Sequence, residues 1–431
     1  MRGKTLDSGP SDGNNSIKNI GRAFSSRNYR LFFVGQSISL VGTWMQQTAL
    51  AWLVYRVTGS AFLLGLVGFV SQVPSLVVAP FAGVLIDRWN RHRVLVVTQS
   101  LAALQASLLA FLVLIHDITI ERILVLSFFL GVVNSFDMPN RQSFVVQMVE
   151  DRKLLGNAIA LNSSMVHIAR MIGPPIAGIL IALFGEGVCF LLNAVSYLAV
   201  IVCVLRMTIA PQPRIVHDKH VLASLKEGFS YAFQFAPIRS LILLLSFTSL
   251  MGMPFVVLMP LYAKDVFHGT SQTLGFLMGA TGMGALSGAL FLASRSSVLG
   301  LGRIIVIASS TLGLGVMAFS HSTLFPLSLL MLYCSGFGMM VLLTSSNSIL
   351  QTIVDEEKRG RVMSLYTMAF MGTVPFGNLL HGSLASRFGP QNTLLLGGVC
   401  CLVGAILFAR QLPALRTLVR PIYVRLGILS E

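Results

Sequence analysis

Charged residues are scarce in this chain of 431 residues, at 11% of the total, and acids are the scarcest, with 16 Asp and Glu against 31 Lys and Arg. A soluble domain carries roughly 25% charged residues, so this sequence could not cover a water-exposed surface of its size. Hydrophobic residues make up 54%. They come in runs of about 20 residues, the length that crosses a bilayer as a helix. The composition therefore excludes a soluble protein and predicts a membrane protein.

Motifs of enzymes are missing as well. No G-x-x-x-x-G-K-S/T phosphate loop occurs, which argues against ATP-driven pumping by this chain. There is no H-E-x-x-H motif, no nucleophile elbow and no carboxylate pair inside an apolar run. The five cysteines all lie inside apolar runs without metal-ligand spacing, so we expect no metal and no cofactor. A membrane-embedded enzyme or sensor would need a catalytic cluster or a sizeable soluble domain, and the sequence offers neither.

The net charge of +15 does not indicate a nucleic-acid partner, because the positive residues do not form one patch interleaved with aromatics. They lie between the apolar runs, and counting along the chain places 26 of the 31 Lys and Arg on one face of the membrane. The positive-inside rule assigns that face to the cytoplasm. We therefore expect a multi-pass protein of a bacterial inner membrane with both termini in the cytoplasm.

The apolar runs number twelve, and each predicts a helix that crosses the bilayer. Their expected ranges are 30–55, 61–86, 93–115, 122–146, 155–183, 187–207, 239–263, 273–294, 303–320, 324–350, 362–387 and 392–410. Several runs exceed the thickness of the bilayer and contain proline, so tilted or kinked helices are expected.

A repeat divides these spans into two sets of six. Six identical residues recur 204 positions later, including Gly173, Gly178 and Gly185, which match Gly377, Gly382 and Gly389. Parallel six-helix repeats build one large class of transporter. The predicted organisation is a disordered cytoplasmic tail, an N-terminal six-helix half, a cytoplasmic linker, a C-terminal six-helix half and a C-terminal tail, over residues 1–28, 29–208, 209–237, 238–411 and 412–431.

The loop after the second span carries a recognisable motif. The stretch from Gly83 to His92 resembles the G-x-x-x-D-R-x-G-R-R/K loop of the major facilitator superfamily, with Asn90 in place of the second glycine. Further stretches, 42–46, 137–142 and 169–174, resemble the branch that contains the enterobactin exporter and related multidrug exporters. The resemblance covers about residues 27–410. It implies an all-α membrane protein with twelve transmembrane helices in two pseudo-symmetric halves.

The superfamily uses this loop as a conformational latch between its halves, so the resemblance implies that role for Gly83, Asp87, Arg88 and Arg91. An aspartate at the C-terminal end of a helix also needs a cationic partner, because that end disfavours an anion. The alternative is a helix-capping cluster that serves topology alone.

Charged residues inside spans are rare and commonly functional. Asp137 and Arg141 lie four residues apart and therefore on one helix face. They are candidates for a proton-coupling site or, alternatively, a structural ion pair. Arg170 lies roughly 24 Å along its helix from Leu154, near the middle of the membrane. It is a candidate contact for an anionic substrate, a partner for Asp137, or a donor to backbone freed by Pro174 and Pro175.

The stretch Gly173, Pro174 to Gly178 resembles the fifth-helix motif of antiporters, or it reflects close helix packing. Polar residues on other spans are candidates to line a central path or to join helices. They are Gln46, Gln47, Asn134, Asn162, Thr248, Asn347 and Gln351. A cluster of methionines between Met251 and Met371 could form an adaptable apolar wall.

The sequence predicts a secondary transporter and not an enzyme. We expect a monomer that exports an amphipathic small molecule, drug-like or siderophore-like, by alternating access, with protons as the coupling ion. A lipid or lysolipid translocator is the alternative within transport, because the same fold and a hydrophobic cavity would serve it.

Overall fold

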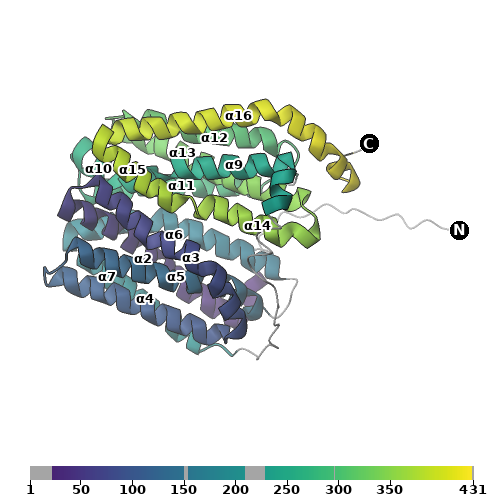
Figure 1. The fold of residues 1–431 in the computed structure, drawn as a ribbon. Coiled ribbons are helices and arrows are strands. Elements are labelled where there is room, and N and C mark those ends of the chain that lie inside the picture. The colour runs from purple at the N-terminus through teal and green to yellow at the C-terminus, as the bar shows by residue number, and fades with distance from the viewer. Residues whose placement is uncertain (1–21, 150–153, 209–228, 296, 430–431) are drawn as a thin grey trace, which may run out of the picture.

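The computed structural model describes residues 22–149, 154–208, 229–295 and 297–429, without the side chains at 80, 84, 87 and 88. Its regular secondary structure is helical throughout these ranges. The helices form two groups that lie side by side, one from the N-terminal part of the chain and one from the C-terminal part (Figure 1).

The N-terminal group is the purple-to-blue set in Figure 1. It consists of α2 (Arg27–Thr58), α3 (Ala61–Arg88), α4 (Arg91–Leu114), α5 (Ile120–Met148), α6 (Leu155–Phe184) and α7 (Glu186–Leu205), preceded by the short η1 (Arg22–Ser25). Polar caps start several of these helices. The Ser60 side chain accepts from the Leu63 N–H before α3, and Asn90 accepts from the Arg93 N–H before α4.

The C-terminal group is the teal-to-yellow set. It consists of α9 (Ala236–Met251), η3 (Met253–Leu258), α10 (Met259–Leu261), η4 (Tyr262–Val266), α11 (Ser271–Ala293), α12 (Leu301–Ser320), α13 (Phe325–Ile353), α14 (Glu356–Met371), α15 (Val374–Phe388) and α16 (Pro390–Arg425). The stretch from α9 to η4 is one broken helix that passes through 3-10 and π turns. Pro254 and Pro260 lie in it, and each removes a backbone donor that a regular helix needs.

Ten helical stretches of the described chain are long and apolar enough to cross a membrane. Two of the twelve predicted spans fall outside that criterion. One is α2, which has 32 residues but buries polar side chains such as Gln36, Ser39 and Gln46. The other is the pair α14 and α15, which a break at Gly372 divides into helices of 16 and 15 residues.

Two predicted tails contain ordered structure. Residues 22–28, placed in the disordered N-terminal tail, form η1 and the start of α2. Ala23 donates its N–H to Asn157 Oδ1 at 2.9 Å, and Ser26 donates to the Met148 carbonyl at 2.7 Å, which holds this segment on the bundle. At the other end α16 continues to Arg425, past residue 410, because Leu415 and Val419 keep one face buried. Of the predicted linker 209–237, residues 209–228 lie outside the described part, and residues 229–234 are helical.

The repeat in the sequence has a counterpart in the backbone. Gly185 joins α6 to α7 with φ 82° and ψ 172°, and Gly389, 204 residues later, joins α15 to α16 with φ 82° and ψ 158°. Residues that carry a side chain rarely adopt a positive φ, so glycine is favoured at both corners. Equivalent residues therefore make equivalent turns in the two groups.

Glycines also bring the two groups into direct contact. A Cβ on Gly178 of α6 would lie 2.6 Å from the Ser271 carbonyl oxygen of α11, and one on Gly382 of α15 would lie 2.7 Å from the Ala61 carbonyl oxygen of α3. These two positions are repeat-equivalent. Backbone approaches this close require small residues. The pairs α6–α11 and α3–α15 thus form the interface between the groups.

Replacing Gly178 by alanine should push α6 and α11 apart, because the added methyl group meets backbone that cannot move aside. We expect a lower melting temperature for the detergent-purified Gly178→Ala variant. Gly156→Ala on the same helix is the control, since a Cβ there meets nothing within 4 Å. Equal melting temperatures for the two variants would contradict the assigned interface.

Candidate functional site

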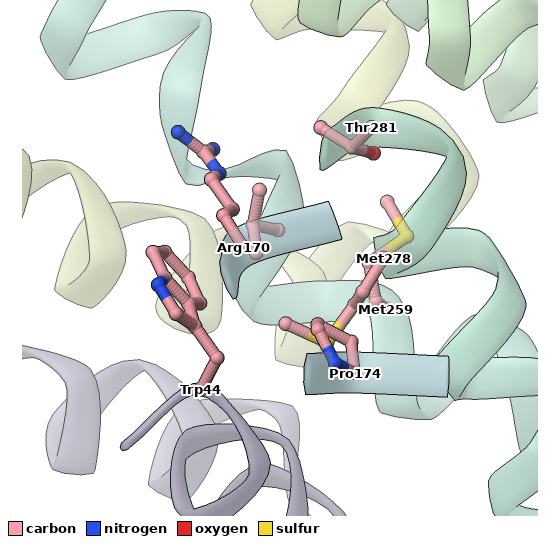
Figure 2. Close-up of a pocket in the computed structure, with 7 residues that line it drawn as sticks. Trp44, Arg170, Pro174, Met259, Met278 and Thr281 are labelled. Carbon is pink, nitrogen blue, oxygen red and sulfur yellow. The ribbon is translucent and has the colours of Figure 1, made fainter. Parts of the chain in front are cut away.

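A cavity lies where the two groups meet, and both groups line it. Trp44, Arg170 and Pro174 come from the N-terminal group, and Val256, Met259, Met278 and Thr281 come from the C-terminal group. The part of it that a water-sized molecule can occupy is about 20 Å³, which is room for about one water molecule. Figure 2 shows Trp44 and Arg170 on one side, facing Met259, Met278 and Thr281.

Arg170 is the charged residue of this lining. Its guanidinium carbon lies 5.3 Å from the centre of the Trp44 ring, a cation–π contact. Within the described part of the chain, the Arg170 side chain has no hydrogen bond and no ion pair. The predicted bond to Asp137 is therefore absent, and so is a bond to backbone near Pro174. A cation in a membrane-spanning helix that lacks an anion is costly, so this position calls for a ligand or for water.

Close packing fixes Arg170 on its helix. A Cβ on Gly282 of α11 would lie 2.7 Å from the Arg170 carbonyl oxygen, and one on Gly173 would lie 2.6 Å from Trp44 Cβ. The backbone of α6 is thus pressed against α11 on one side and α2 on the other. The glycines predicted as an antiporter-like motif, Gly173 and Gly178, serve these contacts, and Pro174 also lines the cavity.

Asp137 lies in a different place from the cavity lining. Its carboxylate pairs with Arg141 at 3.2 Å and accepts hydrogen bonds from Thr98 and Gln99 of α4, each at 2.8 Å. All of these partners belong to the N-terminal group, and Asp137 is 4% exposed. The ion pair predicted from the sequence is present. The hydrogen bonds of Asp137 to Thr98 and Gln99 join α5 to α4, and none of its described partners belongs to the C-terminal group.

The loop that resembles the superfamily motif packs beside this ion pair. Asn140 donates to the Arg91 carbonyl at 2.9 Å, the Trp89 and Phe136 rings stack at 6.3 Å, and His92 Nε2 donates to the Val204 carbonyl at 2.8 Å. The side chains of Asp87 and Arg88 lie outside the described part of the structure. A latch made by Gly83, Asp87, Arg88 and Arg91 therefore stays a prediction.

The other polar residues predicted to line a path separate into two kinds. The Gln46 side chain forms its hydrogen bonds within the N-terminal group. It donates to Gln105 at 2.9 Å and accepts from Asn193 at 2.7 Å. Thr248 is fully buried, and its hydroxyl has no partner among the described atoms. Partly or fully exposed positions are more suitable for a path. They are Gln47, Asn134, Asn162, Asn347 and Gln351, of which the last two bond to each other.

Sequence reasoning did not select most of the cavity lining. Trp44 was visible only as part of a motif, and Val256 and Thr281 carried no signal that separates them from ordinary span residues. Met259 and Met278 belong to the methionine cluster that the sequence singled out, and they are its members in the lining. The break in the helix at Pro254 and Pro260 was the available hint, because irregular helix at membrane depth occurs where it lines a cavity.

Contacts between the groups also gather at one end of the molecule. Tyr55, near the end of α2, donates to Asp265 of η4, and Lys264 lies 5.6 Å from the centre of the Tyr55 ring. Ser271 donates to the Gly178 carbonyl at 2.9 Å, and Phe69 packs edge-on against Phe376 at 5.6 Å. This end lies opposite the Trp89–Arg91 turn, and the cavity lies next to it. We call it the outer end, after the orientation that the positive-inside rule predicts.

The fold, the repeat geometry and the shared cavity are those of a membrane transporter, and comparison with known proteins agrees. The transmembrane secretion effector family matches residues 22–419. The chain belongs to this family of major facilitator transporters. It is a multi-pass membrane protein, and its relatives are transporters and not enzymes.

Two relatives cover most of the chain. It is 26% identical over 385 residues to the staphyloferrin A transporter of Staphylococcus aureus, a match that spans 88% of this chain and 95% of the relative. It is 28% identical over 379 residues to the multidrug efflux pump Tap of Mycolicibacterium fortuitum, across 86% of this chain and 92% of the relative. A solved bacterial homologue of the human lysosomal transporter Spinster, inward-facing and unoccupied, has a TM-score of 0.68 and 13% identity over 88% of this chain and 96% of its own.

Removing the Asp137 carboxylate should destabilise this transporter, because Arg141 would lose its anion while three-quarters buried. Removing one partner of a buried ion pair lowers the free energy of unfolding by about 3 kcal/mol. The detergent-purified Asp137→Ala variant should therefore melt at a clearly lower temperature than the wild type. The control is Asp117→Ala, whose pair with Arg122 is exposed and contributes about 0.5 kcal/mol. Similar small shifts for both variants would show that the Asp137 pair is not a structural tie.

Proposed function

We propose that this protein is a secondary exporter of an amphipathic small molecule and that it works by alternating access. The cavity between the two groups carries this proposal. A site lined by both groups changes its shape and its exposure when one group rocks against the other, which is how such transporters move a substrate. The efflux and siderophore transport named for the relatives supports this function.

The proposed architecture is twelve helices in two halves, residues 29–208 and 238–411. The ten apolar stretches, together with α2 and the broken pair α14–α15, would supply the twelve crossings. The equivalent corners at Gly185 and Gly389 and the equivalent contacts at Gly178 and Gly382 support the duplication. An even number of crossings and the distribution of Lys and Arg would place both termini in the cytoplasm.

The structure fits an inward-facing state. Contacts between the groups hold the outer end together, whereas Gln351, near the opposite end of α13, is exposed. An exposed amide in a membrane-spanning helix is more stable facing a water-filled cavity than facing lipid. From this state the cavity would widen to receive a substrate from the cytoplasm.

Proton coupling at Asp137 is the least supported part of the sequence prediction. A coupling group has to sense the change of state, and the described partners of Asp137 all lie within one group. Asp137→Asn keeps the size of the side chain and removes its charge. If Asp137 carries the coupling proton, this variant should still exchange substrate but should no longer concentrate it against a gradient.

Arg170 gives the direct test of the exporter. Cells that lack their main exporters should accumulate less of some compound in a panel of dyes, drugs, siderophores and labelled lysolipids when they express this protein. Arg170→Ala should abolish that difference while the protein remains folded and in the membrane. Arg122→Ala, an exposed arginine at the edge of α5, is the control and should export normally. Export that survives in Arg170→Ala would rule out Arg170 as a substrate contact, and lipid transfer alone would favour a lipid translocator.

The outer closure can be tested by labelling. Tyr55→Phe removes the hydroxyl that bonds across the groups to Asp265, so the outer end should open more often. A single cysteine at Thr281, with the five native cysteines replaced, should then react faster with an impermeant maleimide added outside. Tyr262→Phe is the matched control, because that hydroxyl bonds within one group, to the Ser320 carbonyl at 3.0 Å. Equal labelling rates in the two variants would contradict the assignment of the outer closure.

A further inference from the structure

The cavity has a fixed positive charge that the described part of the protein does not neutralise. Arg170 stacks on Trp44, and the remaining lining is proline, valine, methionine and threonine. Arginine is charged at any physiological pH. The empty site in the middle of the membrane therefore carries one positive charge.

Three acids that the structure describes on neighbouring helices are engaged elsewhere. Asp137 pairs with Arg141, Glu186 pairs with Arg56 at 2.6 Å, and Asp265 accepts from Tyr55. Each of these bonds is stable without Arg170. None of these acids pairs with Arg170, so a ligand can supply the negative charge for the guanidinium.

We propose that the cavity takes an organic anion and that its export is electrogenic, with the membrane potential acting on the Arg170 charge. This rests on the proposed exporter function. The anionic group would pair with the Arg170 guanidinium, and Thr281 could donate a further hydrogen bond from across the cavity. The Trp44 ring and the thioethers of Met259 and Met278 would contact an aromatic or other apolar body.

The charge balance follows from this pairing. A site that holds one positive charge and one bound monoanion is neutral, so the loaded transporter crosses the field without electrical work. The empty site returns with its positive charge, and an inside-negative potential pulls that charge back toward the cytoplasm. One negative charge leaves the cell in each cycle. At equilibrium, 100 mV corresponds to a gradient of about fifty-fold for one charge.

This driving force needs no proton. The site has no carboxylate in its described lining with which a proton and an organic cation could compete. If a proton also enters in each cycle, the two charge movements add and the response to potential becomes steeper. Dependence on the membrane potential is therefore expected in both cases.

The experiment uses purified full-length protein in liposomes and three probes with one aromatic body. The probes are pyrenesulfonate, a permanent anion, its neutral sulfonamide, and pyrenemethyl trimethylammonium, a permanent cation. A potassium gradient with valinomycin sets the potential, and strong buffer on both sides removes any pH gradient. The sulfonate should accumulate on the positive side in a ratio close to that of the potassium gradient, and reversing the potential should reverse its movement.

Variants separate charge from packing. Arg170→Gln should lose both the preference for the anion and the response to potential. Arg170→Lys keeps the charge and should retain both, with sulfonate binding weakened about tenfold by loss of the planar guanidinium. Trp44→Leu should weaken binding of the aromatic body while the preference for the anion persists. Arg122→Gln, outside the cavity, should transport like the wild type.

The outcomes distinguish this inference from the function on which it rests. Sulfonate transport that does not respond to the membrane potential, or transport of the cation in preference to the sulfonate, would contradict the proposed anion site. The proposed export function would be unaffected by either result. Potential-driven sulfonate transport that persists in Arg170→Gln would contradict the role of Arg170 as the charge that binds the anion and responds to the potential. Failure of all three probes, together with unchanged accumulation of every compound in cells, would contradict the proposed export itself.

Discussion

A guanidinium in the middle of a membrane-spanning helix has to be solvated or neutralised, and much of this structure is arranged around that requirement. Arg170 lies on α6 at the point where α6 presses against both α2 and α11. Glycines on the neighbouring helices make those approaches possible, and Trp44 covers one face of the guanidinium. The charge is thereby held at the boundary between the two groups of helices.

Contacts within one group of helices differ in role from contacts between the two groups. Within the N-terminal group, the bonds of Asp137 to Arg141, Thr98 and Gln99 and those of Gln46 to its amide partners join helices that would move together. Across the groups, the outer end is joined by bonds such as those from Tyr55 to Asp265 and from Ser271 to the Gly178 carbonyl. The helices that carry this closure, α2 and the broken helix from α9 to η4, also line the cavity. The same helices therefore connect the cavity to the outer end.

Much of the fold could be predicted from sequence, because a bilayer imposes long apolar runs and the repeat places Gly178 and Gly382 in register. The membrane character and ten of the spans followed from the apolar runs, and the ion pair at Asp137 followed from its spacing with Arg141. The sequence could not decide between the two roles left open for Gln46, because an amide on a helix indicates polarity but not direction; its bonds to α4 and α7 favour the joining of helices. Val256 and Thr281 could not be selected, since apolar and hydroxyl side chains line a cavity and fill a core equally well. The ordered segment before Tyr29 was missed because its bonds to Asn157 and Met148 are long-range.

The central claim is that the two groups move against each other around the Arg170 cavity. Double electron–electron resonance tests it most directly, because it measures the distance between two spin labels. One pair of labels, at Val57 and Gln272, reports on the outer end, and a second pair, at Trp89 and Glu356, reports on the opposite end. On adding an aromatic sulfonate, the outer distance should lengthen while the inner distance shortens, and Arg170→Gln should abolish both changes. Distances that stay constant, or that lengthen and shorten together, would contradict the account.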